Sequence, residues 1–265
     1  MNKYTDNDKS ILFPRVEIIG IIGIPEIKHK DNIADIIVSK SLEQGTPIKK
    51  NDIIIITQKI VSKSEGRIKN LINIKPSDYA IKLASRVNKD PRLIELIINE
   101  SKSIIRIDEE RNILITETKQ GFICANAGID NSNIPGNNNV SLLPKDADKS
   151  ANKICSDISH LLNNKSISVI ITDTFGRAWR HGQVNFAIGA SRIEPIVDYI
   201  NSKDAQGKTL TSTNICIADE LASSAELVTF KSDNIPVSII RNYPFSKSNS
   251  GAKKIIRPKN EDLFR

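Results

Sequence analysis

The sequence predicts an α+β protein in which mixed sheets carry flanking helices, rather than a doubly wound parallel sheet. Apolar β-branched runs are interspersed with segments that carry Ile and Leu at helical spacing, and their order does not follow a strict βαβ repeat. Neither a GxxxxGK[ST] loop nor a GxGxxG fingerprint is present. We therefore expect a fold that is neither a P-loop nor a Rossmann fold.

The N-terminal part predicts two core strands with a helix between them. Residues 15–24 and 52–57 are β-branched apolar runs that are typical of buried strands. Asp31 is expected to cap a helix that ends at Gly45. Residues 58–67 are rich in Lys and Ser, so we expect a polar loop there. The apolar residues expected on one face of the helix are Ile33, Ile36, Ile37 and Leu42.

The middle of the chain predicts a pair of helices followed by short strands. Residues 76–89 and 91–101 each begin at or near proline and carry Ile and Leu at helical spacing. The other elements expected here are a hairpin (104–107 and 112–116), a strand (121–129) and a turn-rich segment (130–140).

The C-terminal part predicts a long helix and the remaining strands. Residues 148–162 form a helical pattern with Asp or Ser caps, and residues 166–171 form a buried strand that ends in Thr172, Asp173 and Thr174. The later elements expected are strands at 186–193, 214–218 and 235–240 and a helix at 219–228.

Length and composition indicate a folded protein. With 265 residues the chain can bury its own core as one large domain or two small ones. The hydrophobic content of 39% and the charged content of 26% are those of globular proteins, which argues against general disorder. Residues 1–14 are expected to form a flexible N-terminal tail, and residues 15–265 the folded domain.

Several classes of function are disfavoured. The apolar runs are too short to span a membrane, and the polar N-terminus does not resemble a secretory signal, so we expect a cytoplasmic protein without a membrane role. The net charge of +7 comes from lysines spread along the whole chain, so we do not expect nucleic-acid binding. Disulfide, zinc-knuckle or histidine-metal spacing is not found among Cys124, Cys155, Cys216, His29, His160 and His181.

The segment IITDTFGRAWR (170–180) combines a carboxylate, hydroxyls and cations after a buried strand. Asp173 and Thr174 supply the hard oxygen ligands that Mg²⁺ or Mn²⁺ prefers, and Arg177 and Arg180 could clamp phosphate oxygens. The same residues also fit a capped turn with surface arginines. The local pattern leaves both interpretations open.

A second carboxylate follows a strand in the segment NAGIDNSN (126–133). If the fold brings Asp130 and Asp173 together, their like charges would require a cation between them. The alternative is an Asx-type turn at Asp130, which the surrounding asparagines and serine also favour.

The segment after the second strand offers three cations, Lys59, Lys63 and Arg67. They could contact a polyphosphate, or they could belong to a solvated basic loop, and charge spacing does not separate these alternatives.

Together these segments resemble the coenzyme F420-0:L-glutamate ligase (coenzyme F420 gamma-glutamyl ligase) family, and the resemblance runs from about residue 18 to the end. Besides NAGIDNSN and IITDTFGRAWR, the motifs that carry it are GIPEI (23–27), KSEGR (63–67), LLPKDADKSA (142–151), AIG (187–189), ADEL (218–221), IRP (256–258) and DLFR (262–265).

The resemblance implies a GTP-dependent ligase of the F420 gamma-glutamyl ligase-like fold that is a homodimer. Its substrates would be coenzyme F420-0 and L-glutamate, joined as an amide through an acyl phosphate, with further glutamates added through γ-linkages. Its cofactors would be Mg²⁺ or Mn²⁺, with K⁺ as a further candidate. Residues 15–265 would then form a ligase domain, which could consist of two intertwined subdomains.

The resemblance also implies the site residues. Asp130 and Asp173 correspond to ligands of a first metal and Thr174 to a ligand of a second. The catalytic residues are not identified, with Arg177 and Arg180 as candidates. The nucleotide contacts would be Ile24, Pro25, Glu26, Ile27, Gln58, Lys59, Lys63 and Asn133, together with the loop Thr229, Phe230, Lys231, Ser232, Asp233, Asn234 and Ile235.

The loop at 229–235 departs from the glycine-rich pattern of many relatives. Lys231 cannot ligate a cation while it is charged, and Phe230 replaces a residue that would let the backbone approach phosphate closely. The second metal site is therefore left open, with direct contact between Lys231 and phosphate as the alternative. Two other functions are weighed against the ligase: a metal-dependent phosphohydrolase and a non-catalytic nucleotide-binding protein.

Overall fold

A five-stranded sheet forms the centre of the computed structural model, which describes residues 14–230 and 233–264. The strands β2 and β8 are parallel, and the other neighbours are antiparallel. This mixed arrangement confirms the predicted α+β class. The strand order is β1 (Glu17–Gly20), β12 (Val237–Arg241), β2 (Ile53–Thr57), β8 (Ser168–Arg177) and β9 (Arg180–Ser191).

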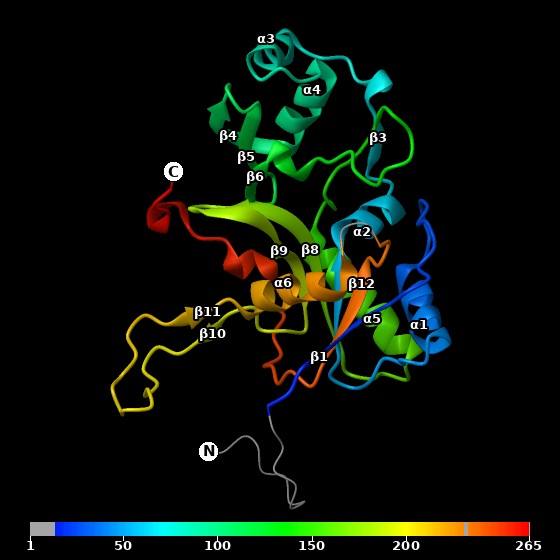
Figure 1. Cartoon of the computed structure of the whole chain (residues 1–265), viewed down its shortest axis with the longest axis vertical. Coiled ribbons are helices and arrows are strands. Elements are labelled where there is room, and N and C mark those ends of the chain that lie inside the picture. Colours follow the sequence, from blue (N-terminus) through cyan, green and yellow to red (C-terminus); the bar gives the residue numbers. More distant parts are fainter. Residues whose placement is uncertain (1–13, 231–232, 265) are drawn as a thin grey trace, which may run out of the picture.

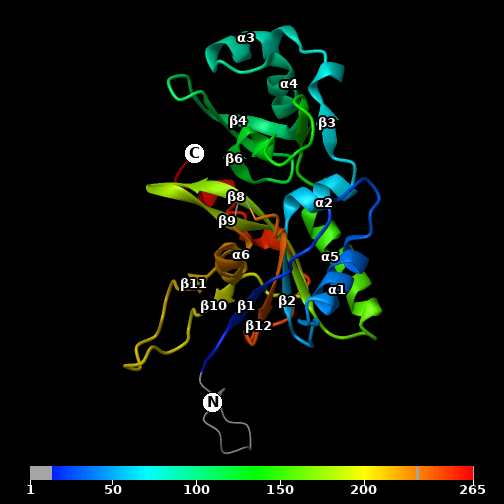
Figure 2. The same ribbon diagram turned by 45° about the vertical axis from the view of Figure 1, so that its right-hand side comes forward.

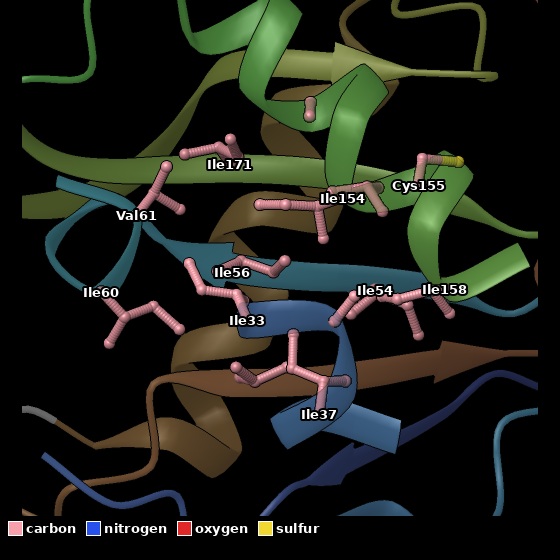
Figure 3. Close-up of a cluster of buried hydrophobic side chains, with 14 of the residues drawn as sticks. Ile33, Ile37, Ile54, Ile56, Ile60, Val61, Ile154, Cys155, Ile158 and Ile171 are labelled. Atoms are coloured by element: carbon pink, nitrogen blue, oxygen red, sulfur yellow. The ribbon is translucent and has the colours of Figure 1, made fainter. Parts of the chain in front are cut away.

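Helices cover both faces of this sheet (Figure 1). The helices α1 (Ile33–Glu43) and α5 (Ala147–Leu161) pack on one face, and α6 (Ile217–Thr229) packs on the other. The unbroken isoleucine run of β2 follows from this arrangement, because a strand that is buried on both faces needs no polar alternation. Ile54 and Ile56 pack with α1 and α5, as Figure 3 shows, whereas Ile53 and Ile55 pack with α6.

The start of α5 is fixed closely to the sheet and to the C-terminal segment. A Cβ atom on Gly189 would collide with the carbonyl oxygen of Ala147, so only glycine allows this approach. The carboxylate of Asp148 accepts hydrogen bonds from the backbone N–H groups of Ala190 at 2.9 Å and Ala252 at 2.7 Å. Asp148 therefore joins β9 to the short helix η3 (Ala252–Ile255).

The middle of the chain folds around a hydrophobic cluster of its own. Figures 1 and 2 show this part beside one end of the five-stranded sheet, in both views. The expected division into two intertwined subdomains stays a prediction. The middle part contains α3 (Asp78–Arg86), α4 (Pro91–Glu100), the antiparallel sheet β4 (Ser101–Asp108), β5 (Ile113–Thr118) and β6 (Ile123–Ala125), the pair β3 (Ile68–Asn70) and β7 (Asn139–Ser141), and the turns η1 (Leu71–Asn73) and η2 (Asn126–Gly128).

Two short strands, β10 (Val197–Asp198) and β11 (Asn214–Ile215), form the base of an arm that extends away from the sheet (Figure 1). The chain ends after the short helix η4 (Lys259–Glu261). Within the described residues, none of the helices combines the length and the apolar character that a membrane crossing requires.

The prediction of a polar loop at 58–67 was wrong, because most of this segment forms helix α2 (Gln58–Ser64). The side chains of Ile60 and Val61 are buried in the core, and Ser62 donates a hydrogen bond to Gln58. Burial on one side stabilises a helix even where lysine and serine dominate the composition.

Several predicted boundaries also differ from the structure. The strand at 15–24 is reduced to β1, and the strand at 121–129 ends at Ala125, where η2 begins. The cap of α1 is Asn32, whose Oδ1 accepts from the N–H of Ala34, and not Asp31. Leu42 is 57% exposed and lies outside the predicted apolar face.

The strand expected at 166–171 is longer than predicted, and this changes the position of Asp173. Pairing with β9 continues β8 through Asp173 and Thr174 as far as Arg177. Asp173 therefore lies within a strand and not at its end. Pairing with β2 does end at Thr172, so β8 continues beyond its parallel neighbour from this point.

Candidate active site

A cavity of about 660 Å³ lies where β8 continues beyond β2. Its walls come from the loop after β1, helix α2, the segment from Ala125 to Asn133, the strands β8 and β9, and the C-terminal end of α6. We call it the main cavity. Segments that are far apart in the sequence thus contribute to one polar site.

The backbone at η2 directs the chain from β6 into the main cavity. Asn126, Ala127 and Gly128 have positive φ angles of 53°, 54° and 70°. A side chain on Gly128 would lie 2.8 Å from Leu143, so only glycine fits. Ala127 adopts this left-handed conformation at a cost of about 1–2 kcal/mol. Backbone strain of this kind is often found at functional sites.

Asp130 occupies the turn that follows. Its carboxylate accepts hydrogen bonds from the backbone N–H of Ser132 at 2.9 Å and from the Ser132 hydroxyl at 2.6 Å. The predicted Asx-type turn is therefore present. It does not exclude a role in the site, because Asp130 also lines the main cavity.

Two lysines of α2 form ion pairs with carboxylates of the main cavity. The ammonium group of Lys59 lies 2.7 Å from Asp130 and also donates to the Ser132 hydroxyl, and that of Lys63 lies 2.6 Å from Glu26. Burial alone would raise the pKa of Asp130, but the hydrogen bonds from Lys59 and Ser132 outweigh it and hold this pKa below its usual value.

Asp173 lines the same cavity from β8. Burial, and then the nearby negative charge of Asp173, raise the pKa of the Cys124 thiol to about 12. Cys124 belongs to β6, which contacts β8 and leads to the turn that contains Asp130. The structure therefore brings the two predicted aspartates to one cavity.

A hydrogen-bonded chain of polar side chains continues from β8 to α6. The hydroxyl of Thr174 donates to Oδ1 of Asn185 at 2.8 Å, and Nδ2 of Asn185 donates to Glu226 at 3.0 Å. All three residues line the main cavity. The sequence analysis missed Asn185 and Glu226. An asparagine between the apolar residues Val184 and Phe186 was the available signal for Asn185.

The model of the F420-0:gamma-glutamyl ligase family matches residues 21–242. The chain belongs to this family. It is 41% identical over 253 residues to the coenzyme F420:L-glutamate ligase of Methanothermobacter thermautotrophicus, covering 94% of this chain and 99% of that protein. The ligase of the same name from Methanocaldococcus jannaschii is 42% identical over 256 residues, or 95% and 97% of the two chains.

A relative from Archaeoglobus fulgidus, also named coenzyme F420:L-glutamate ligase, is 36% identical over 253 residues, covering 95% of this chain and 97% of that protein. The predicted resemblance to the F420 ligase family is therefore confirmed over nearly the whole chain.

The side-chain oxygen atoms of the main cavity are of the kind that a hard divalent cation prefers. The carboxylates of Asp130 and Asp173 and the hydroxyl of Thr174 line the main cavity. Asn126 also lines the main cavity, and its buried Oδ1 accepts no hydrogen bond. Within the described parts of the chain, no three His, Cys, Asp or Glu side chains are grouped to hold a metal. Mg²⁺ typically uses one or two carboxylates and completes its shell with water and substrate phosphates.

The structure brings most of the predicted nucleotide contacts of this family member to the main cavity, but not all of them. Gln58 and Ile27 are buried outside its lining, and Oε1 of Gln58 accepts from Ser62. Asp233 is also outside this lining, and Lys231 and Ser232 lie outside the described residues. The predicted contacts in the lining are Ile24, Pro25, Glu26, Lys59, Lys63, Asn133, Thr229, Phe230, Asn234 and Ile235.

The three arginines considered in the sequence analysis lie outside the main-cavity lining. Arg177 and Arg180 face each other at the end of the β8–β9 hairpin, where Arg177 donates to the carbonyl of His181 at 2.7 Å. Their catalytic role stays a prediction. Arg67 is paired with Glu100 at 2.7 Å and lines a separate, smaller cavity.

Proposed function

We propose that this chain joins L-glutamate to coenzyme F420-0 in a reaction that consumes GTP and requires a divalent cation. One observation carries the proposal: Asp130, Asp173 and two lysines line a single cavity of nucleotide size in a chain of the F420-0:gamma-glutamyl ligase family. Carboxylates for a cation and ammonium groups for phosphates are the two components that a site for a metal-bound nucleotide needs.

The proposed roles follow from these positions. Asp130, Asp173 and Thr174 would hold Mg²⁺ or Mn²⁺, which would supply positive charge beside the transferring phosphoryl group. Lys59 and Lys63 would exchange their carboxylate partners for phosphate oxygens. The nucleotide would lie along the loop after β1 and the C-terminal end of α6, whose residues line the cavity.

The proposed chemistry needs no protein nucleophile. A carboxylate of F420-0 attacks the terminal phosphorus of GTP, forming an acyl phosphate and releasing GDP. The amino group of L-glutamate then attacks the acyl carbon, loses a proton and displaces inorganic phosphate. The protein would position the reactants and stabilise the charge that develops on the phosphoryl oxygens.

The test is to incubate the purified chain with F420-0, GTP, Mn²⁺ and L-glutamate and to measure product masses and released phosphate. We expect F420-0 to gain one or more glutamyl units, with GDP and phosphate released in proportion. Phosphate release that does not require glutamate would instead indicate a phosphohydrolase. Metal-dependent GTP binding without turnover would indicate a non-catalytic nucleotide-binding protein.

The choice of nucleotide and cations, the homodimer and the cytoplasmic location belong to the same proposal. Parallel reactions with ATP in place of GTP, with Mg²⁺ in place of Mn²⁺, and with and without K⁺ would define the cofactors. Sedimentation of the purified protein would test the proposed homodimer, and cell fractionation would test the proposed cytoplasmic location.

A further inference from the structure

Another cavity, of about 250 Å³ and smaller than the main cavity, adjoins it and differs from it in chemistry. The two cavities share Phe175 and Gly176 of β8 as part of their walls. We call the smaller one the aromatic pocket. Its lining includes Phe122 and Ile123 at β6, Phe175 and Phe186 of the β8–β9 hairpin, and Ile255 and Ile256 of the C-terminal segment.

The walls of the aromatic pocket are suited to a flat apolar group. The rings of Phe175 and Phe186 are stacked, with centroids 5.8 Å apart and an interplanar angle of 23°. The C-terminal segment forms another part of the lining, and a Cβ atom on Gly121 would lie only 3.2 Å from Ile256. Aromatic and branched apolar side chains around a pocket favour a planar ring that can stack.

A few polar groups accompany this apolar lining. Asp219 accepts a hydrogen bond from the N–H of Ala187 at 2.9 Å, and burial raises the pKa of its carboxyl group. Arg257 and Asp262 also contribute to the lining. A small number of polar groups in an apolar pocket can orient a heterocyclic edge. Free glutamate fits poorly here, because its charges would meet mostly apolar walls together with two carboxylates and one cation.

We propose that the aromatic pocket binds the planar ring system of the acceptor substrate, while the reacting carboxylate of the same molecule extends into the main cavity. This inference rests on the proposed function, because it takes F420-0 as the acceptor. F420-0 carries a deazaflavin ring far from the carboxylate that must reach the nucleotide. Two adjoining cavities, one apolar and one charged, match these two ends.

The size of the aromatic pocket supports this division. Pockets that hold whole drug-sized ligands usually measure about 300–1,000 Å³. A pocket of about 250 Å³ is therefore suited to one part of a larger molecule. Phe175 and Gly176 line both cavities, so the rest of that molecule would extend along β8 toward the main cavity.

The first experiment uses the wild-type chain and a ring fragment, the deazaflavin with its ribityl chain but without phosphate. Its fluorescence anisotropy is titrated without nucleotide. We expect saturable binding that F420-0 displaces and that GTP with Mg²⁺ does not displace. Displacement by GTP would overturn the proposal, because the ring would then occupy the nucleotide position.

The second experiment fills the aromatic pocket with Ile256→Trp. Because the indole would occupy the space of the stacked ring, we expect ring-fragment binding to weaken and the KM for F420-0 to rise, each about tenfold or more. The KM for GTP should stay within about twofold. The matched control is Ile72→Trp, since Ile72 is 65% exposed and lies outside both cavities.

The outcomes separate this inference from the proposed function. An unchanged KM for F420-0 in Ile256→Trp, with glutamate addition intact, would refute the aromatic pocket as the ring site. Ring-fragment binding that is sensitive to Ile256→Trp, without glutamate addition by the wild type, would support the pocket and refute the ligase. Thermal unfolding of each variant shows whether it is folded, and the wild-type competition does not depend on any variant.

Discussion

Lys59 and Lys63 each pair with a carboxylate that lines the main cavity. A metal-bound nucleotide would offer both sides of these pairs new partners, with the cation beside Asp130 and phosphates beside the lysines. A cation alone would have to compete with the Lys59 ammonium at close range. Metal and nucleotide are therefore expected to enter together more easily than either enters alone.

The variant Lys59→Met should bind Mn²⁺ more tightly in the absence of nucleotide. Removing a positive charge 2.7 Å from Asp130 leaves this carboxylate available to the metal. We expect an increase of about tenfold in Mn²⁺ affinity, which corresponds to about 1.4 kcal/mol at a partly exposed site. Titration followed by electron paramagnetic resonance measures free Mn²⁺ directly. The matched control is Lys153→Met, whose lysine pairs with Asp157 on the exposed side of α5.

An unchanged Mn²⁺ affinity in Lys59→Met would mean that Asp130 does not contribute to the metal site.

Acid should weaken the ion pair between Lys59 and Asp130 in the wild type, as a bound metal should. The depressed pKa of Asp130 means that its pairing stabilises the fold above the unfolded-state pKa, and that this stabilisation is lost as pH falls through the lower folded-state pKa.

The variant Asp173→Asn tests the second carboxylate. It keeps the size of the side chain within β8 but removes a ligand charge, so the fold should persist while metal-dependent turnover falls. A loss of several kcal/mol of charge stabilisation corresponds to about 100-fold or more in turnover. Steady-state kinetics at saturating Mn²⁺ measure this loss, and Asp157→Asn on α5 is the control. Turnover close to that of the wild type would remove Asp173 from the proposed site.

At the scale of single elements, β2 and β12 are joined by a buried ion pair. Arg241 of β12 donates to the carboxylate of Asp52 at 2.7 and 3.0 Å, and Asp52 is 1% exposed. The same carboxylate accepts from the N–H of Lys49 at 2.7 Å. Asp52 precedes β2 directly, so this pair fixes the edge of the core where the strands begin and end.

The variant Asp52→Ala should destabilise the fold by about 3–5 kcal/mol, because it leaves the Arg241 charge buried without its carboxylate. Denaturant unfolding measures this difference. The control is Glu109→Gln, which removes a pair with Arg86 whose side chains are both more than half exposed and should cost less than about 1 kcal/mol. Equal effects of the two substitutions would show that the buried Asp52–Arg241 pair contributes no more to the free energy of unfolding than an exposed pair does.

Two elements show why local patterns predict type better than extent. The composition of residues 58–67 is typical of a loop, but contacts made by Ile60 and Val61 stabilise α2. The local apolar run of β8 stops at Ile171, but pairing with β9 extends the strand to Arg177. In both cases the element is stabilised by contacts with another segment of the chain: the core cluster for α2 and the following strand β9 for β8.

At the scale of the whole molecule, the main cavity joins parts of the chain that belong to different hydrophobic clusters. Ile129 belongs to the cluster of the middle part, whereas Ile60 and Ala225 belong to the clusters on the two faces of the five-stranded sheet. All three line the cavity. A ligand that fills it would therefore contact residues from each of the three hydrophobic clusters.

Saturating GTP with Mg²⁺ should raise the free energy of unfolding by about 2.7 kcal/mol at 100 times the dissociation constant. Thermal unfolding measures the total, and hydrogen exchange locates it. We expect added protection both at residues 126–133 and at the C-terminal end of α6, because both line the main cavity. Protection confined to one of these segments would contradict a nucleotide position between them.

The sequence by itself determined the α+β class, the family and most of the strands and helices. The isoleucine runs, the proline helix starts and the long motifs carry this information locally. The sequence also predicted Asp130 and Asp173 as candidate metal ligands, because each carboxylate follows an apolar run and lies among polar residues.

Only the tertiary structure decided which side chains share a cavity. It placed Asn185 and Glu226 beside Thr174, moved Gln58 and Ile27 into the core, and showed Arg177 and Arg180 outside the main cavity. The physical reason is that strand pairing and helix packing set these positions through contacts between residues far apart in the chain. Spacing along the sequence does not record such contacts.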